Sequence, residues 1–189
     1  MRVRSALTAL ALAAGVAVGV TAAPAQATPA QAASPAASAS TAPASATAPA
    51  APLVTKITHA QATSRFRSSG ITWSSSGGCS NRNNPTCTSF DQLNLASAQG
   101  AQTLKSASGC ALNITGGTET GHAGGTYSHW NGYKLDYSLG TCINNYVTGN
   151  FAYIGQRSDG AAMYQSGSGN IYAREGNHWD VLYYNCGGC

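Results

Sequence analysis

Charged residues are few in this sequence, and its Lys and Arg residues form no cluster. The chain has 10 Lys and Arg against 6 Asp and Glu, a formal net charge of +4. Arg2 and Arg4 lie in a leader that we expect to be removed, which leaves a net charge of about +2 on the exported chain. Proteins that bind nucleic acid carry a basic patch or stripe, so no nucleic-acid partner is predicted.

Long apolar runs are missing after residue 23, and so is the Gly-x-Ser-x-Gly turn of many serine hydrolases. Without a second run of about 20 apolar residues, the chain is not expected to stay in a membrane after loss of its leader. The missing turn argues against Ser-His-Asp hydrolysis.

Large side chains are absent from residues 28–52, which contain only Ala, Pro, Ser, Thr and one Gln. Such a segment has nothing to bury that would offset its ordering entropy. We therefore predict a disordered linker or a removable pro-segment over 28–52.

The first 27 residues have the layout of a secretory signal peptide. A short basic start, Met1–Arg4, precedes a stretch of small apolar residues over 5–23, and Ala25-Gln26-Ala27 supplies a small-x-small cleavage site. A membrane anchor is the alternative, but the cleavage site favours removal. The protein is therefore predicted to be secreted, either free or associated with the cell wall.

Residues 53–189 are long enough for one small domain, and they contain all six cysteines. An even number of cysteines in an exported chain predicts a disulfide framework. Cys79 and Cys87 flank an Asn-rich loop and could pair locally, whereas the remaining connectivity stays open. We interpret Cys186-Gly-Gly-Cys189 as a structural staple rather than a redox pair, because no helix follows it to lower a thiol pKa. A monomer is expected.

Local patterns predict two helices followed by short strands. Thr58 is a candidate N-cap, Ser89 with Gln92 resembles a capping box, and Gly109 is a candidate helix end. Residues 145–154 are ambiguous. The predicted fold is a small α+β domain, with helices on one side of an antiparallel sheet. The expected helices are 58–68 and 90–107, and the expected strands are 71–73, 112–115, 133–137, 163–164, 170–173 and 179–184.

Two sequence motifs contain the residues best suited to bind a metal. The first is Ser128-His129-Trp130-Asn131-Gly132-Tyr133-Lys134-Leu135-Asp136, and the second is Glu175-Gly176-Asn177-His178-Trp179. Imidazole and carboxylate groups are good zinc ligands. On a strand, Asp136 would point to the face opposite Leu135, where a metal would offset the cost of burying a carboxylate. We predict zinc ligation by His129, Asp136 and His178.

Glu175 has the chemistry and spacing of a catalytic base beside that metal. Catalytic zinc keeps one position for water and lowers the pKa of that water to about 7. A carboxylate that does not bind the metal can take the proton of the water and pass it to the leaving amine.

The pattern His129-x-x-Gly132-x-x-x-Asp136 followed by Glu175-x-x-His178-Trp179 resembles the signature of zinc D-Ala-D-Ala carboxypeptidases and their relatives. These relatives include L-Ala-D-Glu peptidases and the peptidase-like domain of Hedgehog proteins, and residues 115–122 resemble a secreted bacterial branch. The resemblance implies a Hedgehog/DD-peptidase-like fold whose antiparallel sheet carries the zinc. It also implies a zinc metallopeptidase that cleaves stem or cross-bridge peptides of peptidoglycan, so the expected partner is a cell-wall peptide.

The sequence departs from this signature at several places. Tyr127 stands where relatives have a Ser, and Lys134 where they often have a small residue. Glu119 stands near the place of an arginine that binds a substrate carboxylate in carboxypeptidases. It would suit a substrate amine or a backbone N–H instead, which favours an endopeptidase or action at a different peptide end.

Four residues near the first motif are candidates for substrate binding or oxyanion stabilisation: His122, Glu119, Tyr127 and Trp130. His122 could also replace one of the predicted ligands, or be a loop residue with no role. Packing is the alternative for Tyr127 and Trp130.

Two competing functions stay open. The same fold could be a non-catalytic secreted binding module with structural zinc, or a disulfide-rich inhibitor without metal. Glu175 favours the enzyme, because a purely structural site needs no spare carboxylate beside the metal.

Overall fold

The computed structural model describes residues 54–184. The predicted signal peptide over 1–27, the predicted linker over 28–52, and Cys186 and Cys189 lie outside this range.

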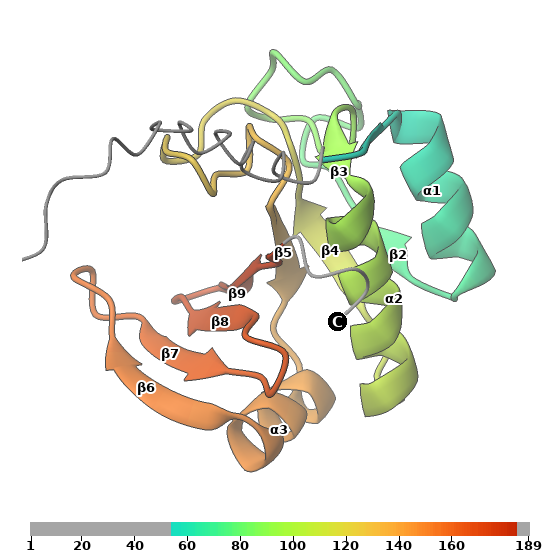
Figure 1. Cartoon of the computed structure of the whole chain (residues 1–189). Helices are drawn as coiled ribbons and strands as arrows, with labels where there is room; N and C mark the ends of the chain where they lie inside the picture. The colour runs from blue at the N-terminus through green and yellow to red at the C-terminus, as the bar shows by residue number, and fades with distance from the viewer. Residues whose placement is uncertain (1–53, 185–189) are drawn as a thin grey trace, which may run out of the picture. The chain divides into compact units, whose positions relative to one another are not determined.

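The described residues form an α+β domain of short elements (Figure 1). The three helices are α1 (His59–Ser68), α2 (Leu95–Ser108) and α3 (Thr141–Asn150). The strands are β1 (Lys56–Ile57), β2 (Thr72–Trp73), β3 (Leu93–Asn94), β4 (Asn113–Gly116), β5 (Lys134–Ser138), β6 (Ala152–Gln156), β7 (Ala162–Gln165), β8 (Ile171–Arg174) and β9 (His178–Leu182).

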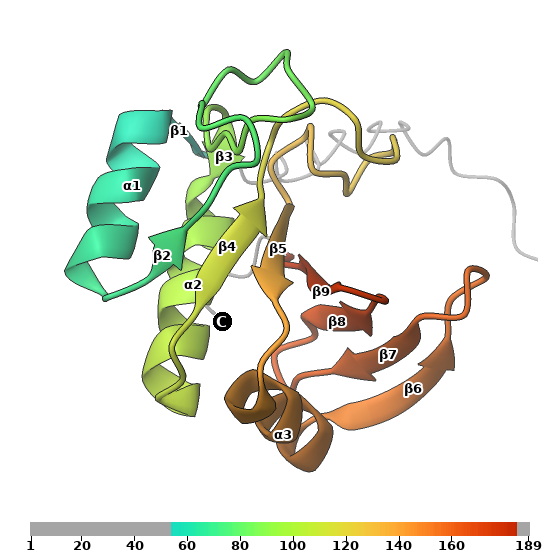
Figure 2. The ribbon, with the colours of Figure 1, turned by 180° about the vertical axis from the view of Figure 1, so that it is seen from behind.

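Seven strands form one mixed sheet in the order β2-β4-β5-β9-β8-β7-β6, and β1 pairs with β3 in a separate small sheet. The expectation of a purely antiparallel sheet was wrong at one pair, because β2 and β4 run parallel. Parallel neighbours need a long crossover, and here the chain between β2 and β4 includes α2. Views from opposite sides show α1 and α2 on one face of the β2-β4-β5 part of the sheet (Figures 1 and 2).

The first helix follows the prediction, whereas the second begins later than expected. Thr58 caps α1 in a reciprocal capping box with Gln61. The capping box predicted from Ser89 and Gln92 was wrong, because Gln92 has a φ of 63° and the chain then pairs as β3 before α2 starts. Gly109 ends α2 in the left-handed conformation, as predicted.

The region 145–154 was ambiguous because it spans two elements, the end of α3 and the start of β6. The chain turns from one to the other at Phe151, whose extended backbone ends the helix.

The alternation of side chains along β5 and β9 divides these strands between a core face and a polar face. Leu135 and Tyr137 of β5 are buried in the hydrophobic core, as are Trp179 and Val181 of β9. Successive side chains of a strand point to opposite faces. The residues between them, above all Asp136, therefore point to the polar face, as the sequence predicted for Asp136.

Two disulfides join the described cysteines, Cys79–Cys87 and Cys110–Cys142. The local pairing was predicted, and the second bridge was left open by the sequence. Disulfides are consistent with an exported protein. None of the helices within residues 54–184 has the length and apolar character needed to cross a bilayer.

Candidate metal centre

A cavity of about 520 Å³ lies over the polar face of β5 and β9. Its wall carries four carboxylates, two basic side chains and three histidines, so anionic groups outnumber the fixed cations. Such a wall favours a bound cation. The lining residues are His122, Ala123, His129, Lys134, Asp136, Arg157, Asp159, Glu175, His178 and Asp180.

The pairing of β5 with β9 brings the two sequence motifs together. The two strands are antiparallel, with Asp136 opposite Asp180 and Ser138 opposite His178. His129 lies just before β5, in a turn that Gly132 completes with a φ of 77°. A Cβ at Gly132 would lie 2.5 Å from the carbonyl oxygen of Gln92, so this sharp turn requires glycine.

Three histidine nitrogens approach the carboxylate of Asp136. Nε2 of His129 lies 3.2 Å and Nε2 of His178 lies 3.5 Å from Oδ1 of Asp136. Nδ1 of His122 lies 3.8 Å from Oδ2 of the same carboxylate. A tetrahedral zinc with bonds of about 2.0–2.1 Å places its ligand atoms about 3.3 Å apart. The two shorter distances match that spacing.

Each of these histidines is held through its other ring nitrogen. Nδ1 of His129 donates to the carbonyl oxygen of Gly117 at 2.7 Å, since a carbonyl oxygen can only accept. His178 makes the same kind of contact with Oδ1 of Asn177 at 2.7 Å, and Nε2 of His122 contacts Glu119 at 3.2 Å. A metal-binding histidine commonly donates its second N–H to such an oxygen, which leaves the facing nitrogen free to bind the metal.

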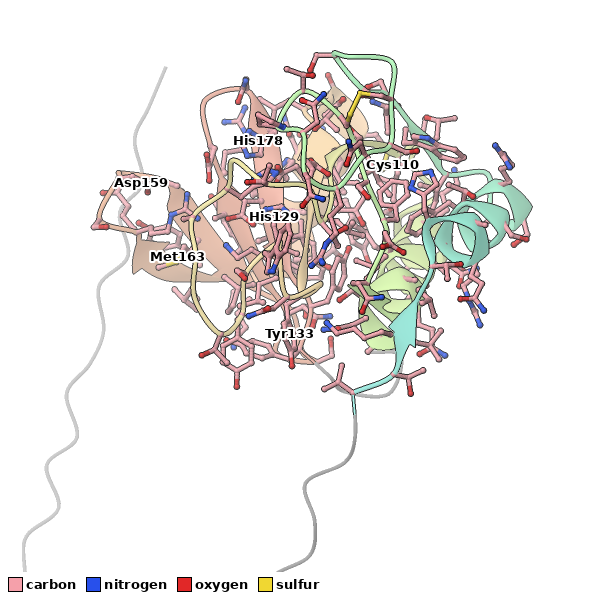
Figure 3. All side chains as sticks on the ribbon, turned by 90° about the horizontal axis from the view of Figure 1, so that it is seen from above. Cys110, His129, Tyr133, Asp159, Met163 and His178 are labelled. Carbon is pink, nitrogen blue, oxygen red and sulfur yellow. A yellow bond between two sulfur atoms is a disulfide. The ribbon has the colours of Figure 1, made fainter. Side chains whose placement is uncertain are left out.

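The residues with potential ligand atoms all within 4.8 Å of one another are His122, His129 and Asp136, and this group could hold a metal ion. Two of the three predicted ligands, His129 and Asp136, therefore lie in the compact group. His122 completes that group. His178 is not a member, but its Nε2 lies 3.5 Å from Oδ1 of Asp136. Figure 3 shows His129 and His178 from above the view of Figure 1, with Asp159 on the loop after β6.

Two buried carboxylate oxygens point into this centre without a well-aligned hydrogen bond. Within residues 54–184, Oδ1 of Asp136 and Oδ1 of Asp180 are buried and accept no well-aligned hydrogen bond, and Nε2 of His129 lies 3.2 and 3.7 Å from them. Burial opposes the charged form of His129, but Asp136 and Asp180 outweigh burial and raise its pKa to about 10. A proton on His129 therefore balances these carboxylates in the metal-free protein, and a metal cation would do the same.

The predicted base, Glu175, lies at the rim of the cavity. Its Oε2 is 3.5 Å from Nε2 of His178, and its Oε1 accepts a hydrogen bond from Arg157. Arg157 lies between β6 and β7 and also binds Asp159 and Asp180. Glu175 is thus beside the centre, and Arg157 holds it in place.

Glu119 binds backbone N–H groups, one of the two roles considered for it from the sequence. Its buried carboxylate accepts hydrogen bonds from the backbone nitrogens of Ser89 at 2.7 Å and Gly117 at 2.9 Å. Burial raises the pKa of Glu119, but the hydrogen bonds from His122, Ser89 and Gly117 outweigh it and leave the pKa below its ordinary value. Glu119 therefore fixes the loop that carries His122 and is not among the cavity-lining residues.

Tyr127 and Trp130 do not line the cavity. The ring of Tyr127 packs edge-on against Tyr133 and Tyr184, and Trp130 lies under the guanidinium of Arg82 at 3.7 Å. Both rings make packing contacts but are exposed, Tyr127 by 49% and Trp130 by 43%, so neither belongs to the core.

Asp180 is a cavity residue that the sequence reasoning did not find. It follows His178 by two positions on β9, so the two side chains point to the same face. This two-residue spacing from His178 was the signal in the sequence that could have identified Asp180. It was missed because the strand around Asp180 is otherwise apolar.

Comparison of the chain with protein-family models, curated proteins and solved structures gives no match. Only the residues and geometry of the cavity therefore indicate a function for this chain.

Proposed function

We propose that this protein is a secreted zinc-dependent peptidase of the DD-peptidase type. The observation that carries the proposal is the meeting of two distant motifs, in which Nε2 atoms of His129 and His178 approach one oxygen of Asp136 at 3.2 and 3.5 Å. Glu175 lies beside them in the same cavity. The α+β fold, with its polar sheet face bearing the site, is compatible with the fold that the motifs imply.

The donor set supports zinc as the metal. Two imidazoles and one carboxylate are three ligands of the types found in catalytic zinc sites, which keep a further position open. When bound, zinc would supply an acidified water and a Lewis acid for a peptide carbonyl. His122, whose Nδ1 faces Asp136 at 3.8 Å, would be available as a further ligand.

Glu175 would act as the proton carrier of the reaction. Its carboxylate lies 3.5 Å from His178 and would take a proton from the attacking water and give it to the leaving amine. Arg157 would hold this carboxylate at the rim of the cavity during both transfers.

Peptides of the bacterial wall are the proposed substrates, on the basis of the motif resemblance and the predicted export. Glu119 does not supply a cation for a terminal carboxylate, and the two cations of the cavity, Lys134 and Arg157, both bind Asp180. Cleavage within a stem or cross-bridge peptide is therefore favoured over removal of a terminal residue.

One observation favours the competing function, a non-catalytic metal-containing binding module. Arg157 forms an ion pair with Glu175, so this carboxylate already has a partner within the protein. In that case the metal would stabilise the fold and Glu175 would serve only as a partner of Arg157.

The test begins with the metal content of the exported protein purified in oxidised form. We expect about one zinc per chain, the stoichiometry of a single catalytic centre, with loss of zinc in His178→Ala. His59→Gln is the matched control, because His59 lies outside the cavity and glutamine can still accept the hydrogen bond from Phe90 N. A wild-type protein that neither contains nor takes up zinc would refute the proposal.

Glu175→Gln then separates the enzyme from the binding module. The enzyme hypothesis expects this variant to keep its zinc and to lose hydrolysis of wall peptides by about 100-fold or more, the usual contribution of a general base. A zinc-loaded wild type that cleaves no stem or cross-bridge peptide would favour the binding module.

A further inference from the structure

The carboxylate of Asp180 is held so that only one of its oxygens is available to the cavity. Oδ2 accepts hydrogen bonds from Lys134 at 2.6 Å and from Arg157 at 2.8 Å. Oδ1 is buried and accepts no well-aligned hydrogen bond within residues 54–184. The two cations therefore anchor the carboxylate and leave Oδ1 pointing away from them.

The free oxygen of Asp180 points to the same histidine nitrogen as the free oxygen of Asp136. Nε2 of His129 lies 3.7 Å from Oδ1 of Asp180 and 3.2 Å from Oδ1 of Asp136. Because Nδ1 of His129 carries a hydrogen, a neutral ring would turn a lone pair at Nε2 toward two anionic oxygens. Either a proton on Nε2 of His129 or a metal ion among the three atoms balances the two carboxylates, and with a metal bound all three atoms face the ion.

The pairing of β5 with β9 fixes the relative positions of Asp136 and Asp180. Asp136 and Asp180 are directly opposite residues of β5 and β9, and their side chains share the polar face. Only 7% and 8% of these side chains are exposed, so solvent does little to separate the two charges.

We infer that Asp180 is a second carboxylate ligand of the metal centre, so that Asp136 and Asp180 bind one ion from two neighbouring strands. The inference rests on the metal centre of the proposed function. Two carboxylates with imidazole form a harder donor set than histidines alone, which suits zinc and cobalt and also favours manganese. Lys134 and Arg157 would hold the second carboxylate in position and offset its charge.

Cobalt binding tests this inference without any assay of hydrolysis. The exported protein is freed of metal, titrated with Co²⁺ and followed by its visible absorption, whose intensity and position report the ligands of the ion. For Asp180→Asn we expect the visible absorption bands of bound Co²⁺ to change and the affinity for Co²⁺ to fall at least ~100-fold. Loss of a residue that only hydrogen-bonds to a metal ligand costs ~10–100-fold in affinity. Asp91→Asn is the matched control, because it removes the same charge at a residue that does not line the cavity. The control should keep the wild-type bands.

The outcomes separate the two claims. Unchanged bands in Asp180→Asn, even with weaker binding, would show that Asp180 only positions other groups, and would overturn the inference while the metal centre stands. A wild type that binds no cobalt would overturn the metal centre and the inference together.

A crystal of the wild-type protein soaked in zinc decides the question if Asp180→Asn does not fold. A distance of about 2.0–2.2 Å from Oδ1 of Asp180 to the metal would support ligation. A distance beyond about 3 Å exceeds any zinc–oxygen bond and would overturn it.

Discussion

Replacing Gly116 by Ala should damage the metal centre without touching any ligand. Gly116 lies at the end of β4, directly opposite Asp136 of β5. Its backbone lies outside the left-handed region, so alanine fits the chain conformation. The added Cβ, however, would lie 2.3 Å from Oδ2 of Asp136.

The size of the effect follows from that distance. Ordinary contacts of a Cβ begin at 3.4 Å, so the carboxylate must move by about 1 Å. A shift of that size is about half the length of a zinc–oxygen bond. We expect zinc affinity to fall about 10–100-fold, which corresponds to about 1.4–2.8 kcal/mol.

Competition with a chelator measures this affinity. Gly124→Ala is the matched control, because it lies in the loop before His129 and a Cβ there would meet no atom within 4 Å. If the two alanine variants bind zinc equally well, then Asp136 is not a ligand or its carboxylate can rotate freely, and the reasoning is refuted.

Three further predictions concern stability, each measured by unfolding of the metal-free protein. Glu119→Gln should cost about 2 kcal/mol at neutral pH, because hydrogen bonds to a charged acceptor are lost. The pKa of Glu119 is lowered by folding, so its stabilisation is present above pH 4.5 and lost as the pH falls. The variant should therefore lose less stability in acid than the wild type, and equal acid sensitivity would contradict this role. Gly149→Ala should stabilise α3 by about 0.5–1 kcal/mol, since a helical glycine with free space around it costs backbone entropy; no rise in Tm would contradict the assignment of this residue to the helix. Burial raises the pKa of Tyr137 and Tyr183 above its ordinary value, so stability should fall as the pH rises above 10, where unfolded tyrosines ionise. Tyrosinate absorption would show these two phenols ionising only with unfolding, and earlier ionisation would argue against their burial.

Several features of the fold could be predicted because they depend on neighbouring residues. The cap of α1 at Thr58 follows from local hydrogen bonding with Gln61. The opposite directions of Asp136 and Leu135 follow from the geometry of any strand. The start of α2 was missed because Gln92 adopts a left-handed conformation and the next residues pair with β1, a contact that no local pattern reveals.

The sequence by itself determined the kinds of side chains that could bind a metal and the strand face that Asp136 occupies. Only the tertiary structure decided that Asp180 lies opposite Asp136, that His122 joins the compact group and that Glu119 serves the loop. The physical reason is that side-chain alternation fixes the face of a strand but neither its neighbour nor its register. Those follow from packing of the apolar faces of β5 and β9 into one core, and that same packing brings the polar faces together as a single cavity.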